Sequence, residues 1–246
     1  MEYNHYKTNR KKRKVFSLRC LLALALVAAV CSSAFLVAAV SRPVRLVFDK
    51  KLYFVCTPVV YLEETAQTSS ISVSAGGGAG YVIERGKGYS AVYSLYMARG
   101  DAEVVCANLQ KGGRKAEIYE VFVTEVYLPS ADVAAKETIA AYFGLYYACI
   151  SLLCSAVNEW EAGNLSAEGV AGCLTSCASV LTRVSTSVHE QKKLQKKRYS
   201  LMQKSIAQTI KMLNGYAAGR FFFGDIRYIA SFMGDFYRQT AKNLKN

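Results

Sequence analysis

The sequence predicts an α+β protein with one transmembrane helix near the N-terminus, a small sheet domain in the middle and a helical hairpin or bundle at the C-terminal end. Three observations predict this order. An uncharged apolar run covers residues 21–40, alternating apolar and polar residues recur between residues 50 and 128, and helical periodicity dominates residues 131–246.

The segment Leu21–Val40 has the length of a membrane span. Twenty residues at about 1.5 Å each make roughly 30 Å, the thickness of the hydrocarbon core of a bilayer. Residues 1–20 hold seven Lys/Arg and one acidic residue, which predicts a basic cytoplasmic tail and puts the rest of the chain outside the cell membrane. A cleaved signal peptide is the alternative, although its apolar core is usually only about 7–15 residues long.

The formal net charge of +13 is spread unevenly along the chain. Residues 41–130 hold ten basic and nine acidic residues, and this near neutrality argues against nucleic acid as a partner. Residues 131–246 hold 14 basic and eight acidic residues. Their densest basic run is either a solvated helix face or a contact for lipid headgroups or teichoic acid, and it comprises Lys192, Lys193, Lys196, Lys197 and Arg198.

After a linker at residues 41–49, the middle of the chain shows strand and helix patterns in turn. The expected strands are rich in aromatic and β-branched residues and cover Leu52–Tyr61, Tyr81–Glu84, Tyr89–Met97 and Ala116–Val126. The expected helices are a weak one at Leu62–Ser72 and an amphipathic one at Arg99–Lys111. This order predicts a ferredoxin-like βαββαβ unit whose two helices share one sheet face, leaving the other face bare for a ligand.

Two stretches of this unit resemble the SPOR domain, a peptidoglycan-binding module of bacterial division and sporulation proteins. They are LYFVCTPVVYLEETAQ and GGAGYVIERGKGYSAVYSLYMARGDAEVVCANLQKGG. The second combines an aromatic alternating strand, a short turn, the triplet Asp-Ala-Glu and a helix that ends in glycine. The resemblance covers residues 50–128, about a third of the chain. A basic tail, one span and an external domain are also typical of such proteins.

The resemblance implies that the bare sheet face binds peptidoglycan glycan strands, with polar side chains on sugar hydroxyls. In the third strand, alternation predicts a helix-facing set of Tyr89, Ala91, Tyr93 and Leu95. The glycan-binding set is then Glu84, Ser90, Val92 and Ser94. This set departs from the family pattern, which offers larger polar or basic side chains. The alternative function is therefore a protein-interaction or assembly module in the envelope that does not bind glycan.

The pattern of residues 131–246 predicts that the C-terminal part is helical. Asp132–Trp160 is uncharged from Thr138 to Asn158, so it is either a helix buried in a bundle or a second membrane span. Apolar stripes then predict one long helix over Ala167–Leu213 and a shorter aromatic helix over Phe221–Tyr237. These helices are expected to pack on one another and to contact envelope protein partners.

No pattern predicts catalysis, a metal site or a cofactor. The chain has two histidines, and its eight cysteines lack the paired spacing of a zinc site. Disulfides among Cys149, Cys154, Cys173 and Cys177 are one alternative, and packing as small apolar side chains is the other. The glycine-rich segment GYVIERGKG lacks the spacing of a phosphate-binding loop. The sequence thus predicts a non-enzymatic protein of the bacterial cell envelope.

Overall fold

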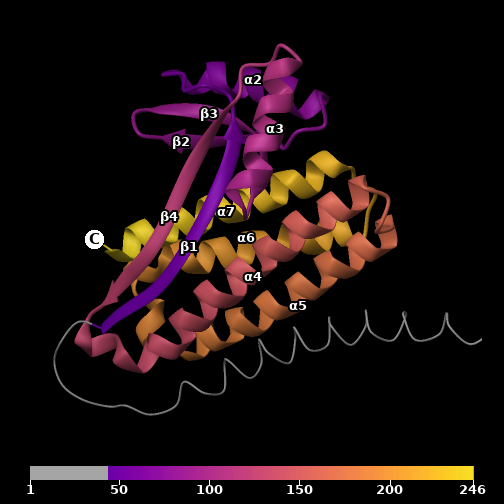
Figure 1. The fold of residues 1–246 in the computed structure, drawn as a ribbon. Helices are drawn as coiled ribbons and strands as arrows, with labels where there is room; N and C mark the ends of the chain where they lie inside the picture. The colour runs from indigo at the N-terminus through magenta and orange to yellow at the C-terminus, as the bar shows by residue number, and fades with distance from the viewer. Residues whose placement is uncertain (1–43, 246) are drawn as a thin grey trace, which may run out of the picture. The chain divides into compact units, whose positions relative to one another are not determined.

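The computed structural model describes residues 44–245, without the side chains of residues 130, 131 and 133. The predicted cytoplasmic tail and membrane span lie outside these residues. The α+β class is confirmed, and the strands form one antiparallel sheet (Figure 1). The first part of the described chain contains β1 (Val44–Cys56), α2 (Glu63–Ala75), β2 (Tyr81–Arg85), β3 (Gly88–Tyr96), α3 (Arg99–Lys111) and β4 (Glu117–Leu128).

The first strand is longer than expected, and the predicted linker at residues 41–49 is wrong from Val44 onward. β1 pairs with β4 along its whole length, beginning with Val44 opposite Leu128. Its register shifts between Val47 and Lys50, where Asp49 takes a positive φ of 45°. Asp is one of the residues that tolerate this conformation. The irregularity interrupts the alternation, so the local pattern identifies only the second half of the strand.

The strands lie in the order β2-β3-β1-β4, and every neighbouring pair is antiparallel. A two-residue turn joins β2 to β3, and its Gly86 has a φ of 60°, which a side chain would disfavour. Helices α2 and α3 share a small core with β1 and β3, as expected. This core comprises Tyr53, Val55, Val73, Ala91, Tyr93, Tyr96, Ala102, Cys106 and Ala116.

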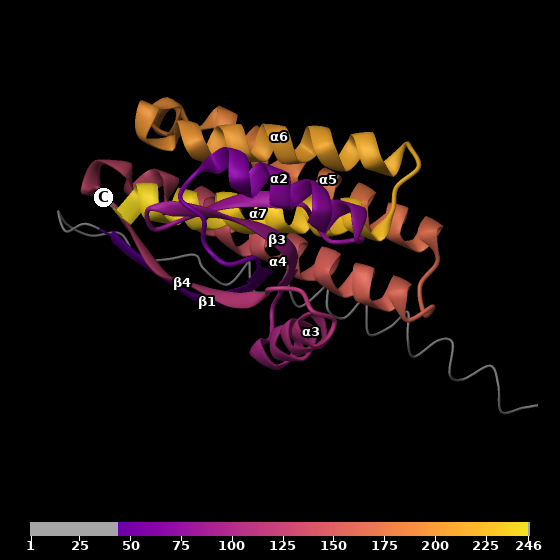
Figure 2. The same cartoon turned by 90° about the horizontal axis from the view of Figure 1, so that it is seen from above.

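The C-terminal part is a four-helix bundle. Its elements are the 3-10 turn η1 (Ser130–Ala135), α4 (Lys136–Glu161), α5 (Ala167–Glu190), the 3-10 turns η2 (Lys192–Gln195) and η3 (Lys197–Tyr199), α6 (Ser200–Ala217) and α7 (Phe223–Lys245). Successive helices pack against each other and α7 packs back on α4, which makes the ring α4-α5-α6-α7, and Figure 2 shows the four side by side. The helix α4 is long and apolar enough to cross a membrane, but half of its most apolar stretch is buried in this bundle.

The prediction of one long helix over residues 167–213 is wrong, because η2 and η3 divide it into α5 and α6. The apolar stripe of the sequence gives way to charge in this segment, and Gln191 takes an extended conformation that ends α5. Two helices that fold back can bury both apolar stripes against each other. The stripe residues Val184 and Val188 of α5 and Met202 and Ile206 of α6 are all buried in the same core.

The bundle and the sheet also share that core. α7 contacts β2, β3 and β4, and α4 contacts β1. Figure 1 shows α7 beneath β2 and β3, with α2 above them. Buried residues of all four strands belong to one apolar cluster with the helices, including Phe54, Ile83, Val92, Val121 and Met233. The described residues therefore form one compact unit, with no separate bundle domain after residue 130.

Two tyrosines of α4 anchor α6 through buried hydroxyl pairs. The Tyr142 hydroxyl lies 2.9 Å from the Ser205 hydroxyl, and the Tyr146 hydroxyl lies 2.7 Å from that of Thr209. The two pairs lie one helical turn apart on each helix, so they define how α4 and α6 align. All four residues are buried.

We expect Tyr146→Phe to lower the free energy of unfolding by about 1–3 kcal/mol, because it leaves the buried Thr209 hydroxyl without its partner. Adding Thr209→Val should recover much of this loss. Tyr147→Phe, one position along, is the control, since that hydroxyl makes only a long 3.4 Å contact with the Lys51 carbonyl. Urea unfolding monitored by circular dichroism measures all four proteins. Equal losses for Tyr146→Phe and Tyr147→Phe would contradict the role of the pair.

Candidate functional site

The sheet face predicted to be bare is covered. Ser90 and Val92 are 0% exposed and Ser94 is 4% exposed, so three of the four predicted glycan-binding residues are inaccessible. Val92 belongs to the large core shared with the bundle, and Tyr81, which lies opposite it, packs against that core. The expectation failed because the sequence pattern of one element does not reveal which later element packs on it.

Helix α7 supplies the cover over this face. A Cβ built on its Gly234 would lie 2.7 Å from Leu95 Cδ2 and 3.0 Å from Phe54 Cζ, so the helix backbone approaches the sheet closely there. The ring of Tyr81 makes edge-to-face contacts with Tyr228 and Phe232 of α7. Its hydroxyl donates to the buried carboxylate of Asp235 over 2.9 Å.

The predicted alternation is also wrong at two of the four positions. Glu84 is exposed but pairs with Tyr89, whereas Ser90 pairs with Ile83, so Glu84 lies on the opposite face from Ser90. The register between β1 and β3 shifts at Val55/Cys56, which leaves Ser94 opposite Val55 and Leu95 opposite Phe54. Leu95 consequently joins Val92 in the large core, although strict alternation puts the two on different faces.

The longest run of exposed large apolar side chains near the sheet lies instead at the end where β1 stops, whereas Val47 and Phe122 are exposed elsewhere on the strands. The loop that joins β1 to α2 exposes three large apolar side chains in the four-residue stretch 59–62: Val59, Tyr61 and Leu62. Tyr61 is 82% exposed and Leu62 is 67% exposed. We call residues 57–62 the apolar tip. Sequence reasoning assigned residues 57–61 to a strand, and Pro58 was the signal that the strand ends before them.

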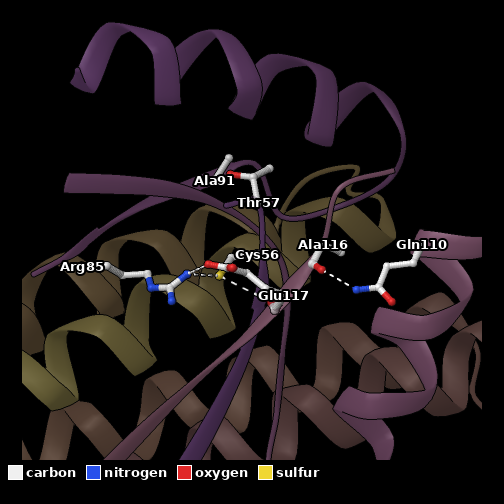
Figure 3. A network of polar contacts seen from close by, with 7 residues as sticks. All are labelled: Cys56, Thr57, Arg85, Ala91, Gln110, Ala116 and Glu117. Carbon is white, nitrogen blue, oxygen red and sulfur yellow. Dashed lines mark hydrogen bonds and ion pairs between the residues drawn. The ribbon is translucent and has the colours of Figure 1, made fainter. Parts of the chain in front are cut away.

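Backbone hydrogen bonds to β3 hold the apolar tip. The Thr57 amide donates to the Ala91 carbonyl over 2.8 Å, and the Ala91 amide donates to the Thr57 hydroxyl over 3.0 Å (Figure 3). Val60 and Tyr89 exchange two further backbone hydrogen bonds of 2.8 and 2.9 Å. A loop fixed in this way loses little conformational entropy when a partner binds it.

A polar cluster lies beside the apolar tip. The Arg85 guanidinium donates to the Glu117 carboxylate and to the Cys56 thiol (Figure 3). It also lies 4.5 Å from the centre of the Tyr119 ring. The Glu117 carbonyl accepts a contact from the same thiol. Burial raises the pKa of Cys56 to about 11 despite the nearby Arg85, so the thiol is neutral at pH 7 and is a poor nucleophile. The cluster ties β2, β1 and β4 together at this end.

Residues 44–245 contain six of the eight cysteines of the chain. Five of these six are buried, as expected of cysteines that pack as small apolar side chains. No three His, Cys, Asp or Glu side chains gather there in a way that could hold a metal ion.

Comparison with known proteins gives no relative. No family model matches the chain, and neither a curated protein nor a solved structure is significantly similar to it.

The opposite end of the sheet carries a second buried polar cluster. Asp132 accepts a hydrogen bond from Lys196 over 2.6 Å and one from the Tyr199 hydroxyl over 2.9 Å. Burial alone would raise the pKa of Asp132, but these two bonds hold it below its usual value of 3.8. Burial and the neighbouring carboxylate raise the pKa of Tyr199 to about 12.

This cluster predicts acid sensitivity. Because the pKa of Asp132 is lower in the folded than in the unfolded protein, its contribution to stability is complete above about pH 5 and is lost as the pH falls below 3.8. The acid-dependent loss of unfolding free energy should therefore be smaller in Asp132→Asn than in the unchanged protein. Urea unfolding between pH 3 and pH 7 measures this difference. Identical pH profiles for the two proteins would contradict it.

Proposed function

We propose that this protein is a membrane-anchored, non-catalytic protein of the bacterial envelope whose folded unit is a protein-interaction and assembly module. The observation that carries the proposal is that the sheet face opposite α2 and α3 is covered by the helix bundle. That face is apolar, with Phe54, Ile83, Leu95 and Val121 buried against the bundle. A face of this composition suits a protein core and offers few groups to sugar hydroxyls.

The SPOR-like assignment of the sheet unit is part of the proposal. The connection β1-α2-β2-β3-α3-β4 and the strand order β2-β3-β1-β4 support a ferredoxin-like arrangement. In this proposal the chain keeps the SPOR-like framework and uses the face that would bind glycan to hold its own helices. A role in division or sporulation follows only from the resemblance.

The proposed anchor is the apolar segment of residues 21–40. Its length and the basic residues before it support a single span with a cytoplasmic N-terminus and an extracytoplasmic folded unit. The helix α4 contributes several fully buried residues to the common core, which supports a place inside the folded unit.

The partner proposed for the apolar tip is a protein with an apolar patch. The tip exposes an aromatic and an aliphatic side chain side by side in sequence, and aromatic anchors on fixed backbone are typical of the centre of protein interfaces. The apolar tip follows β1, which has 13 residues. At about 3.3 Å per residue, the tip therefore lies about 40 Å from Val44, where the described chain begins.

Tyr61→Ser/Leu62→Ser tests the tip. We expect the free energy of unfolding to change by no more than about 0.5 kcal/mol, because both side chains are exposed, while partner binding is lost. The readout is site-specific photocrosslinking in cells with the photoreactive residue at position 59. Ile71→Ser is the matched control, since Ile71 is equally exposed, at 71%, but lies on α2 outside the tip.

The outcomes separate the two candidate functions. The proposal predicts protein adducts that disappear in the double variant and persist in Ile71→Ser. The full-length protein should also fail to co-sediment with sacculi stripped of stem peptides. Binding to stripped sacculi, with no protein adduct at the tip, would restore glycan binding as the function and refute the assembly role.

A further inference from the structure

A basic surface lies at the end of the unit where the described chain begins. Arg45 at the start of β1 pairs with Tyr127 near the end of β4. The Arg198 guanidinium donates to the Tyr127 carbonyl over 3.0 Å and to the Leu244 carbonyl over 2.7 Å. These contacts bring η3 and the end of α7 beside the start of β1. Figure 1 shows the C-terminal end of α7 near these strand ends.

The charges at this end are mostly positive. Two acidic side chains at this end form ion pairs. Glu125 pairs with Arg45, and Asp132 pairs with Lys196. Two further acids, Glu137 and Glu190, are exposed there. Six other lysines are exposed at this end, on η2, η3 and the adjoining ends of α4 and α7: Lys136, Lys192, Lys193, Lys197, Lys242 and Lys245. We call these six residues the basal lysines.

The length of the chain between the proposed anchor and β1 limits where this end can lie. Only residues 41–43 separate Val40 from Val44, and this connection spans no more than about 14 Å when fully extended. Headgroups attract lysines over about one Debye length, which is about 8 Å at physiological ionic strength. An end of the unit tied so closely to the bilayer has its lysines at or near that range.

We propose that the basal lysines form a docking surface for anionic lipid headgroups and hold the folded unit on the bilayer with the apolar tip pointing away. This inference rests on the proposed anchor. It goes beyond it by specifying the lipid chemistry and the orientation of the unit. Lysine suits the role because its ammonium group is a flexible point charge that needs no fixed geometry from its partner.

Lysine labelling of the full-length protein in nanodiscs tests the proposal. The probe is a water-soluble amine-acylating reagent, and the labelled lysines are counted by mass spectrometry. Discs of phosphatidylcholine are compared with discs that contain half phosphatidylglycerol, at low and high salt. Lys87, Lys111 and Lys115 are internal controls, because they are exposed near the far end of β1.

We expect phosphatidylglycerol to slow the labelling of Lys192, Lys193 and Lys197 at least threefold at low salt and to leave the three controls unchanged. High salt should abolish the difference. In Lys192→Glu/Lys193→Glu/Lys197→Glu the protection of Lys242 and Lys245 should also be lost. The matched variant Lys87→Glu/Lys111→Glu/Lys115→Glu should keep it.

Three results would overturn the proposal. If the protein co-purifies with the discs but its basal lysines are labelled at the same rate with and without phosphatidylglycerol, the docking surface is refuted and the anchor is not. Protein that fails to co-purify with discs would refute the anchor, and the docking surface with it. Protection by soluble polyglycerol phosphate but not by phosphatidylglycerol would replace the lipid with a soluble polyanion.

Discussion

Gly234→Val is expected to lower the free energy of unfolding by about 3 kcal/mol, among the largest effects of a single substitution in this protein. Gly234 is the point where α7 comes closest to the sheet, and even a Cβ would lie 2.7 Å from Leu95 and 3.0 Å from Phe54. Both neighbours are buried, so neither can move without disturbing the core. The helix must therefore shift away from β1 and β3.

Gly144→Val is the matched control for this substitution. Gly144 also lies inside a long helix, α4, but it is exposed, and a Cβ there meets nothing within 4 Å. Valine has the higher helix propensity, so this variant should be more stable by about 0.4 kcal/mol. Urea unfolding monitored by circular dichroism gives both values. Effects of the same sign and size would mean that α7 does not pack closely on the sheet.

Asp235→Ala should cost about 3–5 kcal/mol, because it leaves buried donors without an acceptor. The carboxylate accepts hydrogen bonds from Tyr81, from Arg238 at 2.6 and 3.0 Å, and from Gln239 at 2.7 Å. The Arg238 side chain is largely buried, so its charge is left unpaired in the variant. Removing the charge as well, in Asp235→Leu/Arg238→Met, should recover most of the stability.

A double-mutant cycle with Tyr81→Phe measures how much of the stability lost in Asp235→Ala comes from the hydrogen bond with Tyr81. Tyr81→Phe alone should cost about 1 kcal/mol, and the Asp235→Ala/Tyr81→Phe protein should be less destabilised than the sum of the two single variants. Additive losses would show that the hydroxyl and the carboxylate do not interact. In that case the contact between α7 and β2 would depend on the aromatic rings alone.

The strands and helices between residues 81 and 128 could be predicted from the sequence because their signals are local. Helix α3 begins at Arg99 and ends at Lys111, as its apolar stripe and the glycines after it indicate. The βαββαβ order of the elements could be predicted for the same reason, and it is confirmed. The first half of β1 was missed because it is stabilised by pairing with β4, more than 70 residues away, rather than by an alternating pattern.

The candidate site could not be predicted, because its location depends on tertiary packing. Val92 fits a bare sheet face as well as a buried one, and only the fold of α7 decides between them. A single bulge near Tyr93 was enough to move Leu95 to the other side of the sheet. Tyr61 and Leu62 resemble strand or helix residues in a sequence, and their exposure became visible only in three dimensions.

Hydrogen exchange of the full-length protein tests the central claim, that α7 is a permanent part of the core and closes the sheet face. Mass spectrometry would follow peptides from α7, residues 223–245, and from β3, residues 88–96, with and without stripped glycan strands. We predict that the slowest amides of both segments exchange with the same free energy of opening, through global unfolding, and that glycan changes neither. An α7 that opens at a lower free energy than β3, with glycan protecting the uncovered strand, would contradict the claim.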